Sequence, residues 1–210
     1  DGKELAFIEN RATLKVLNLA SKQSRTILTD KELFSWGDND QNFEWSPDGK
    51  WFAFSYAIEG VSNSEIGIIS TDGKGKIFNV TENGFNDGSP KWAMGGKMLL
   101  YETDRDGLRA KANSGGSQSD IYAVVLNQDA WDKFRLSKEE AALLKDQDEK
   151  AAKADTSKNK IKKDSLINIE FDGLTYRKQK LTIHSSSLAD ALVSKDGETL
   201  YYLARFEKGL

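Results

Sequence analysis

The stretch around the single histidine is where chemistry would be expected first. His184 is followed by Ser185, Ser186 and Ser187, and Asp190 lies a few residues further on. A serine nucleophile needs a base that reaches its hydroxyl group and an acid that orients the base. Adjacent residues of an extended chain point to opposite sides, so His184 and Ser185 cannot easily share a proton. We interpret this stretch as a loop between two structural units and expect no catalytic residue in it.

Metal and phosphate sites have equally little support. One histidine and no cysteine leave no basis for a histidine or thiolate metal site. The run Asp-Arg-Asp-Gly at 104–107 is similar to the opening of a calcium loop, but Gly115 stands where a glutamate would complete it. The run Gly-Gly-Ser at 115–117 lacks the lysine and the glycine spacing of a phosphate-binding loop. We interpret the first run as a hairpin tip and the second as a loop, and expect no metal and no cofactor.

Two weaker patterns add no site. The tripeptide Asn-Val-Thr at 79–81 fits a glycosylation acceptor, but it lies on a predicted strand and such tripeptides are frequent by chance. Glycosidases use paired carboxylates, and nothing among the 33 acidic residues singles out a pair.

Composition excludes several classes of partner. The 30 basic and 33 acidic residues give a net charge of -3, without the basic field that attracts nucleic acid or anionic membranes. No run approaches the roughly 18 apolar residues that span a bilayer. The first four residues are neither a signal peptide nor a natural start, so we expect a piece of a larger protein whose ends cut through repeats.

The chain contains an internal repeat. The run Trp-Ser-Pro-Asp-Gly-Lys at 45–50 precedes an apolar strand, and it recurs in altered form at 92–97 and 193–198. The chain opens with the second half of the same unit at 1–8. The aligned glycines are Gly2, Gly49, Gly96 and Gly197, with spacings of 47, 47 and 101 residues. A side-chain pattern that returns every 47 residues indicates a repeat architecture and not a single β-sandwich.

Each unit has the layout of four short strands. Asp-Gly between two apolar runs is a strong hairpin signal, because glycine adopts positive φ without a Cβ penalty. Short β-branched or aromatic runs follow at regular offsets. The predicted third strands span 14–19, 66–69 and 121–126, and the predicted fourth strands span 26–29, 77–81 and 180–182. Four strands in 40 to 50 residues describe a propeller blade.

We therefore predict an all-β fold of consecutive four-stranded antiparallel blades in a partial or open β-propeller. The whole chain forms one segment, with an incomplete blade at 1–30, a blade at 42–81, a blade at 89–183 and an incomplete blade at 189–206. We expect the aromatic residues of the first and second strands to pack between blades. These are Trp45, Trp51, Phe52, Phe54, Trp92, Tyr101, Tyr201 and Tyr202.

A charged insertion at 137–164 lengthens the third unit. Ser137 and Glu140 have capping-box spacing, so a short amphipathic helix should begin there and fade near Ala154. The lysine-rich second half offers little apolar surface to offset the entropy of ordering, which favours a solvated loop over a docking arm for a neighbouring domain or subunit. The alternating run at 166–173 is predicted to be a strand that returns the chain to the sheet.

The sequence resembles two known families. The Ser-Pro-Asp-Gly-Lys unit is similar to the TolB-type propeller repeat. From about residue 43 to the end, the chain resembles the propeller region of tricorn-like serine peptidases. The resemblance rests on runs at 103–107, 115–117, 120–122, 129–137 and 169–174, with Glu139, Glu140 and the charged insert between the last two.

The resemblance implies a non-catalytic role beside a protease domain. Such a propeller would gate or channel peptide substrate, or scaffold the protease, and this segment itself would not be an enzyme. The alternatives are a TolB-like protein-binding propeller without a protease and a propeller fused to a different hydrolase. The expected partners are the remaining blades, the protease domain, peptide substrate and other copies bound through exposed blade edges. The resemblance favours the periplasm, with the cytoplasm as the alternative.

Overall fold

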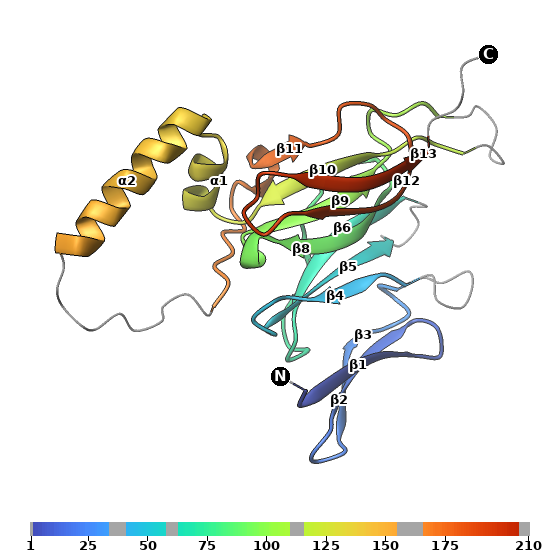
Figure 1. Ribbon diagram of the computed structural model, residues 1–210. Helices are drawn as coiled ribbons and strands as arrows, with labels where there is room; N and C mark the ends of the chain where they lie inside the picture. The colour runs from blue at the N-terminus through green and yellow to red at the C-terminus, as the bar shows by residue number, and fades with distance from the viewer. Residues whose placement is uncertain (1, 34–40, 58–62, 110–115, 155–165, 206–210) are drawn as a thin grey trace.

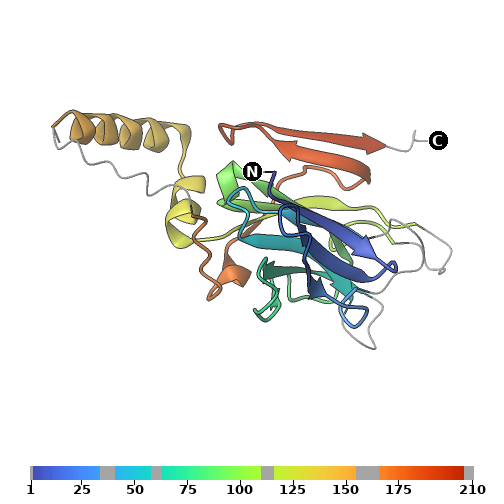
Figure 2. The ribbon, with the colours of Figure 1, turned by 90° about the horizontal axis from the view of Figure 1, so that it is seen from below.

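The computed structural model describes residues 2–33, 41–57, 63–109, 116–154 and 166–205, and all structural statements below concern these residues. Four antiparallel sheets succeed one another along the chain (Figure 1). In both ribbon views the helical insertion projects from one side of the stacked sheets (Figure 2). The all-β prediction with an open propeller arrangement is confirmed.

The strands follow chain order within each sheet. The first sheet holds three strands, the second and third hold four each, and the last holds two. The strands are β1 (Glu4–Glu9), β2 (Thr13–Asn18) and β3 (Ser24–Leu28); β4 (Phe43–Trp45), β5 (Trp51–Ala57), β6 (Ser64–Ser70) and β7 (Phe78–Asn79); β8 (Asp87–Ala93), β9 (Met98–Thr103), β10 (Asp120–Val125) and β11 (Lys178–Lys180); β12 (Ser187–Val193) and β13 (Leu200–Arg205). Each predicted third and fourth strand overlaps one of these strands.

The turn before each second strand is built from local hydrogen bonds. In the second sheet, the Ser46 hydroxyl donates to Asp48 at 2.6 Å and accepts from the Trp51 amide at 2.9 Å. Gly49 adopts φ 71°, which an L side chain would strain. The turn of the last sheet repeats the arrangement, with the hydroxyl of Ser194 in place of that of Ser46. These contacts join residues at most five apart, so the sequence pattern predicts them directly.

The core lies between the faces of successive sheets. One buried cluster joins the first two sheets, a second joins the second and third, and a third joins the third and fourth. Phe52, Phe54 and Tyr101 are buried, as predicted, and Trp45, Trp51, Trp92 and Tyr202 are partly buried against these clusters. Tyr201 is instead 57% exposed because no described sheet covers its face of β13, so its packing between blades stays a prediction.

Two helices lie in the connection between β10 and β11: α1 (Gln128–Phe134), before the charged insertion, and α2 (Lys138–Ala154), within it. The predicted capping box is confirmed, because Glu140 N–H donates to the Ser137 hydroxyl at 3.2 Å and Ser137 N–H donates to the Glu140 carboxylate at 2.8 Å. Sequence analysis missed α1, which begins at an Asn127 cap that accepts from the Ala130 amide at 2.8 Å. In the described part of the chain, neither helix has the length and apolar character needed to cross a membrane.

The prediction of a strand at 166–173 is wrong. This segment runs without strand pairing, because the edge of β10 is already paired with β11. Buried Arg177 holds the segment by donating to the carbonyls of Glu170 and Asp172, while its Nε donates to Val125 at 3.0 Å. The alternating apolar residues still serve the core, since Phe171 stacks on Phe78 with ring centroids 3.6 Å apart.

Candidate functional site

The first strands of successive sheets lie next to one another along the inner side of the stack. β4 and β8 occupy the same edge of their sheets, and β12 follows β8 in the next sheet (Figure 1). Between them is a cavity of about 380 Å³, which we call the channel-wall pocket. Its lining consists of residues 42–44, 89–91, 100–102, 121 and 189–191.

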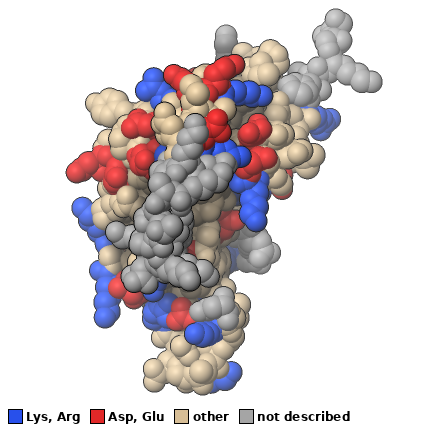
Figure 3. All heavy atoms as spheres, turned by 60° about the vertical axis from the view of Figure 1, so that its left-hand side comes forward, with Lys and Arg blue, Asp and Glu red and all other residues tan. Residues whose placement is uncertain are grey.

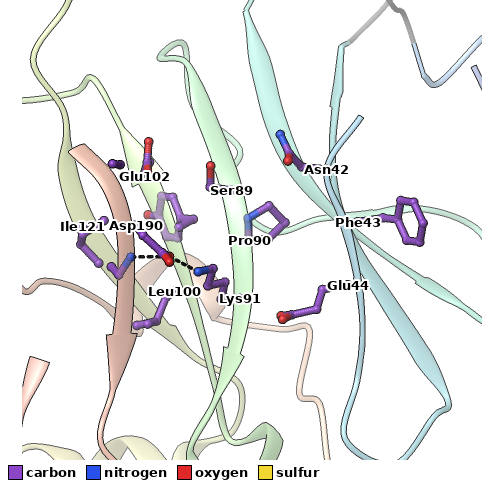
Figure 4. A pocket seen from close by; sticks show the side chains of 13 residues that line it. Asn42, Phe43, Glu44, Ser89, Pro90, Lys91, Leu100, Glu102, Ile121 and Asp190 are labelled. Carbon is purple, nitrogen blue, oxygen red and sulfur yellow. Dashed lines mark hydrogen bonds and ion pairs between the residues drawn. The ribbon is translucent and has the colours of Figure 1, made fainter. Parts of the chain in front are cut away.

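Side chains join the three first strands across this pocket. The Glu44 carboxylate accepts from the Trp92 amide at 2.7 Å, and the Trp92 indole donates to the Glu44 carbonyl at 3.3 Å. Lys91 forms an ion pair with Asp190, which Figure 4 shows bridging β8 and β12. These contacts pair polar groups of β4, β8 and β12 that would otherwise be exposed to solvent or to a ligand. They therefore set the spacing of the strands that line the pocket.

The pocket carries more negative than positive charge. Its lining includes the carboxylates of Glu44, Glu102 and Asp190 and a single lysine, Lys91. The bond from Lys91 lowers the pKa of Asp190. Burial raises the pKa of Glu102, and nearby Asp190 raises it further while Lys91 opposes the shift. The arrangement suits a cationic group, such as the ammonium or guanidinium of a peptide.

The pocket contains no assembled nucleophile and base. Ser89 lies in the lining, but nearby Lys91 is bound to Asp190, and no hydrogen bond among the described residues joins Lys91 to Ser89. Ser89 adopts φ 52°, within an irregularity of β8 between Gly88 and Lys91. This left-handed backbone costs about 1–2 kcal/mol and turns the inner strand.

Comparison with solved structures identifies the fold. The chain superimposes on the tricorn protease with a TM-score of 0.59 and 14% identity, over 91% of this chain and 17% of that one. It superimposes on TolB from Acinetobacter baumannii with a TM-score of 0.53 and 16% identity, over 98% of this chain and 36% of that one. The chain has a TolB/tricorn-type β-propeller fold. No protein-family model and no curated protein matches the sequence.

The propeller segment spans less than two fifths of either structure. At 14% and 16% identity, the likeness shows the fold alone. In a propeller the first strands of the blades face the central axis, so the channel-wall pocket lies on the side where a channel would run.

The structure separates the residues of the rejected triad. His184 is exposed, the Ser185 hydroxyl donates to Asp120 at 2.6 Å, and Asp190 binds Lys91. No hydrogen bond among the described residues joins His184 to Ser185 or Asp190. The expected loop between two units is what the structure has at this place, between β11 and β12.

The run at 104–107 serves the loop between β9 and β10. Asp104 accepts from the Asn86 amide at 3.0 Å and from Arg109 at 2.8 Å, and Asp106 accepts from the Tyr122 hydroxyl at 2.6 Å. Within the described ranges, no group of three or more metal-ligating His, Cys, Asp or Glu side chains occurs. Gly115 lies outside the described residues.

Asn79 of the possible glycosylation tripeptide is used locally. Its side-chain oxygen accepts from the amides of Thr81 and Glu82, at 3.1 and 2.9 Å. Thr81 is 1% exposed. An acceptor tripeptide must be accessible to the transferring enzyme, so this geometry disfavours modification of the folded chain.

Sequence reasoning missed the residues of the channel-wall pocket, apart from Asp190, which it considered only beside His184. A signal was present, because Glu44 and Lys91 occupy the same position of the repeat, 47 residues apart and directly before the aligned tryptophans. A charge at that position in both complete units indicates a shared environment. Its partner could not be inferred, since Asp190 lies 99 residues from Lys91.

A second polar cluster is buried between the second and third sheets. Glu65 and Asp87 are 3% and 0% exposed, and both contact Asn83, whose amide group donates to Asp87 at 2.7 Å. Burial raises the pKa of both carboxyl groups. Lys178 of β11 donates to the Thr81 carbonyl at 2.6 Å, and burial lowers its pKa although both carboxylates oppose that shift. This cluster joins two blades and is enclosed by them.

Proposed function

We propose that this segment is a non-catalytic propeller of a tricorn-like serine peptidase. We propose further that it gates or channels peptide substrate along the side formed by the first strands of its sheets. The channel-wall pocket carries the proposal, because it combines an excess of carboxylates with a position where a propeller channel runs. Pockets of a few hundred Å³ with a few convergent polar groups are typical ligand sites. The structural likeness to the tricorn protease supports the connection to peptide chemistry.

The proposal predicts that narrowing the pocket impairs passage of long peptides. Ala189 is exposed and lines the pocket, so Ala189→Trp should obstruct it without disturbing the core. In the protein that carries this propeller, we expect kcat/KM for an unstructured fluorogenic peptide to fall about tenfold, while a three-residue substrate is cleaved as before. The matched control is Ala20→Trp at an exposed turn of the first sheet.

Two results would overturn the proposal. Equal cleavage of the long peptide by the Ala189→Trp protein would remove the pocket from the substrate path. Peptide turnover by the propeller segment alone, abolished by His184→Ala, would place catalysis in the segment itself.

The second candidate is a TolB-like protein-binding propeller without a protease. The likeness to TolB from Acinetobacter baumannii, which extends over 98% of this chain, favours it. An intact parent protein that cleaves no peptide but retains a protein ligand in a pull-down would support this candidate over the first. The TolB-type repeat also supports a periplasmic location, which fractionation of the native host would test.

We further propose that the outer face of the last sheet packs on another blade. Leu192, Tyr201 and Leu203 are 52%, 57% and 66% exposed on this face. Leu100, which occupies the repeat position of Tyr201, is 2% exposed because the last sheet covers it. Repetition of the same packing would cover Tyr201 as well.

This proposal predicts self-association of the segment when it is prepared alone. Exposed apolar faces and unpaired strand edges favour edge or face contacts between copies. We expect concentration-dependent dimers in gel filtration with light scattering. Tyr201→Ser combined with Leu203→Ser should shift the equilibrium towards monomer, and a wild-type segment that stays monomeric at high concentration would contradict the packing.

A further inference from the structure

Helices α1 and α2 border a second cavity, which lies beside the start of β9 and the end of β10. This cavity, which we call the insertion groove, has a volume of about 1120 Å³ and shares no lining residue with the channel-wall pocket. Three parts of the chain form it: the turns of three successive sheets, the helices α1 and α2, and the start of the segment at 166–173. A groove formed by all three exists only because the insertion returns beside the turns.

Helix α2 presents a regular face to the insertion groove. Lys138, Ala141, Ala142 and Lys145 line it, at spacings of three, one and three residues that place them on one side of a helix. The two alanines leave space beside the helix axis, and the two lysines flank them about 10 Å apart at 1.5 Å per residue. None of the α2 side chains described is buried, so no described residue covers this face closely.

The floor of the insertion groove is apolar and held by close contacts. An added Cβ on Gly197 would lie 2.5 Å from the Met94 sulfur, and one on Gly96 would overlap Ile167 Cδ1. The side chains of Met94 and Ile167 therefore pack directly against the backbone of these two glycines. Leu166 beside them is 68% exposed. The result is a preformed apolar surface with one large side chain still open to a ligand.

The hydrogen-bonding groups left available in the groove are mostly donors. The Asp48 carboxylate already accepts from Ser46, Lys50 and Ile167, and the Asp196 carboxylate accepts from Ser194 and Glu198. Asp129 is bound by Lys133 at 3.0 Å.

Three lysines of the lining, Lys97, Lys138 and Lys145, make no ion pair with any carboxylate that the structure describes. Among the described residues, Glu198 is the one carboxylate of the groove lining whose side chain makes no hydrogen bond or ion pair. Figure 3 shows acidic and basic residues interspersed over the face that carries the insertion. Recognition would therefore depend on these individual ammonium groups and not on a broad field.

We propose that the insertion groove docks an acidic peptide segment of another protein. Apolar side chains of that segment would cover Leu166 and the alanines of α2, and its carboxylates would pair with Lys97, Lys138 and Lys145. Most helical stability in proteins comes from tertiary packing, and no described α2 side chain is buried, so docking would also stabilise α2. This site is separate from the channel-wall pocket, and the proposal does not depend on the parent being a peptidase.

A direct binding measurement tests the proposal. The probe is a fluorescein-labelled ten-residue peptide of alternating glutamate and leucine, compared with the same peptide carrying lysine in place of glutamate. Fluorescence anisotropy with the whole chain should give at least about tenfold tighter binding of the glutamate peptide, weakening as salt is raised. Equal binding of the two peptides, tighter binding of the lysine peptide, or no binding of either would overturn the proposal.

Two matched pairs of variants locate the binding. Lys138→Glu with Lys145→Glu should weaken the glutamate peptide about tenfold, whereas Lys31→Glu, at an exposed position in the first sheet's loop, should leave it unchanged. Ala142→Trp should fill the groove and weaken binding by a similar factor, whereas Leu143→Trp on another side of α2 should not.

Because these side chains are not buried, circular dichroism should show that all of these variants fold. Loss of binding in both members of a pair, or in neither, would contradict the proposed place of docking.

Discussion

Replacing Lys178 by methionine should destabilise the propeller by about 2 kcal/mol at pH 7. Lys178 is the cation that faces the buried carboxyl groups of Glu65 and Asp87 across the second and third sheets. Removing one member of a buried charged set leaves the others uncompensated, at a cost of about 3–5 kcal/mol. We expect less here because Lys178 itself is partly exposed and solvent screens it. Urea denaturation measures the loss, with Lys74→Met at an exposed turn as control.

The loss should shrink as the pH falls. Burial raises the pKa of Glu65 above its ordinary 4.5 and that of Asp87 above its ordinary 3.8, so the folded chain binds these protons more tightly than the unfolded chain. Their contribution to stability is fully present below the ordinary values and is lost as the pH rises through the folded-state values. Without Lys178 both pKa values rise further, so the variant should recover stability as the pH falls from 7 through the folded-state pKa values.

A second substitution separates this explanation from a loss of packing. Asp87→Asn keeps an oxygen and an amide near Asn83 while it removes one buried charge. Added to Lys178→Met, it should restore more than half of the lost stability at pH 7 and flatten the pH dependence. A loss that is independent of pH and unchanged by Asp87→Asn would show that the lysine acts through its methylene groups alone.

The Phe52→Ala variant should lose about 3–5 kcal/mol of unfolding free energy. Phe52 is 0% exposed and belongs to the cluster between the first and second sheets. Its ring packs on Trp45 with centroids 4.3 Å apart and meets Phe43 edge-on at 5.9 Å. Truncation to alanine removes these contacts and leaves a cavity that the stiff sheets cannot close.

Phe52→Leu is the matched control, because it keeps most of the apolar volume and should cost less than about 1.5 kcal/mol. Both variants can be compared by thermal and urea denaturation. Phe43 lines the channel-wall pocket and packs on Phe52. Phe52→Ala should therefore also weaken any peptide binding measured in that pocket. A cost below about 1 kcal/mol for the alanine variant would contradict close packing of the first two sheets.

The features that could be predicted from the sequence depend on neighbouring residues. The capping box joins Ser137 to Glu140, three residues away, and the turn at Ser46 ends five residues later at Trp51. The hydrogen bonds of each feature join residues within one turn of the chain. Residue types and spacing are therefore enough to predict it. The repeat extends this local information along the chain, since equivalent turns at a fixed period must give equivalent sheets.

The exceptions fall where distant parts of the chain compete for the same place. The run at 166–173 alternates like a strand, but β11 occupies the sheet edge and the carbonyls of Glu170 and Asp172 are bound by Arg177 instead. Tyr201 repeats the position of buried Leu100, yet burial depends on the sheet that lies outside it. A local pattern shows which structure a segment can form, and the elements packed beside the segment decide whether that structure forms.

By itself the sequence determined the sheets, their order and the helix that begins at Ser137, because the turns and caps that specify them are local. Only the tertiary structure decided the candidate sites. The Glu44 carboxylate meets Trp92 across 48 residues and Lys91 meets Asp190 across 99, and the pKa shifts of Glu65 and Asp87 arise from burial between sheets. Such contacts depend on how the blades stack, because sequence spacing does not encode distance between residues so far apart.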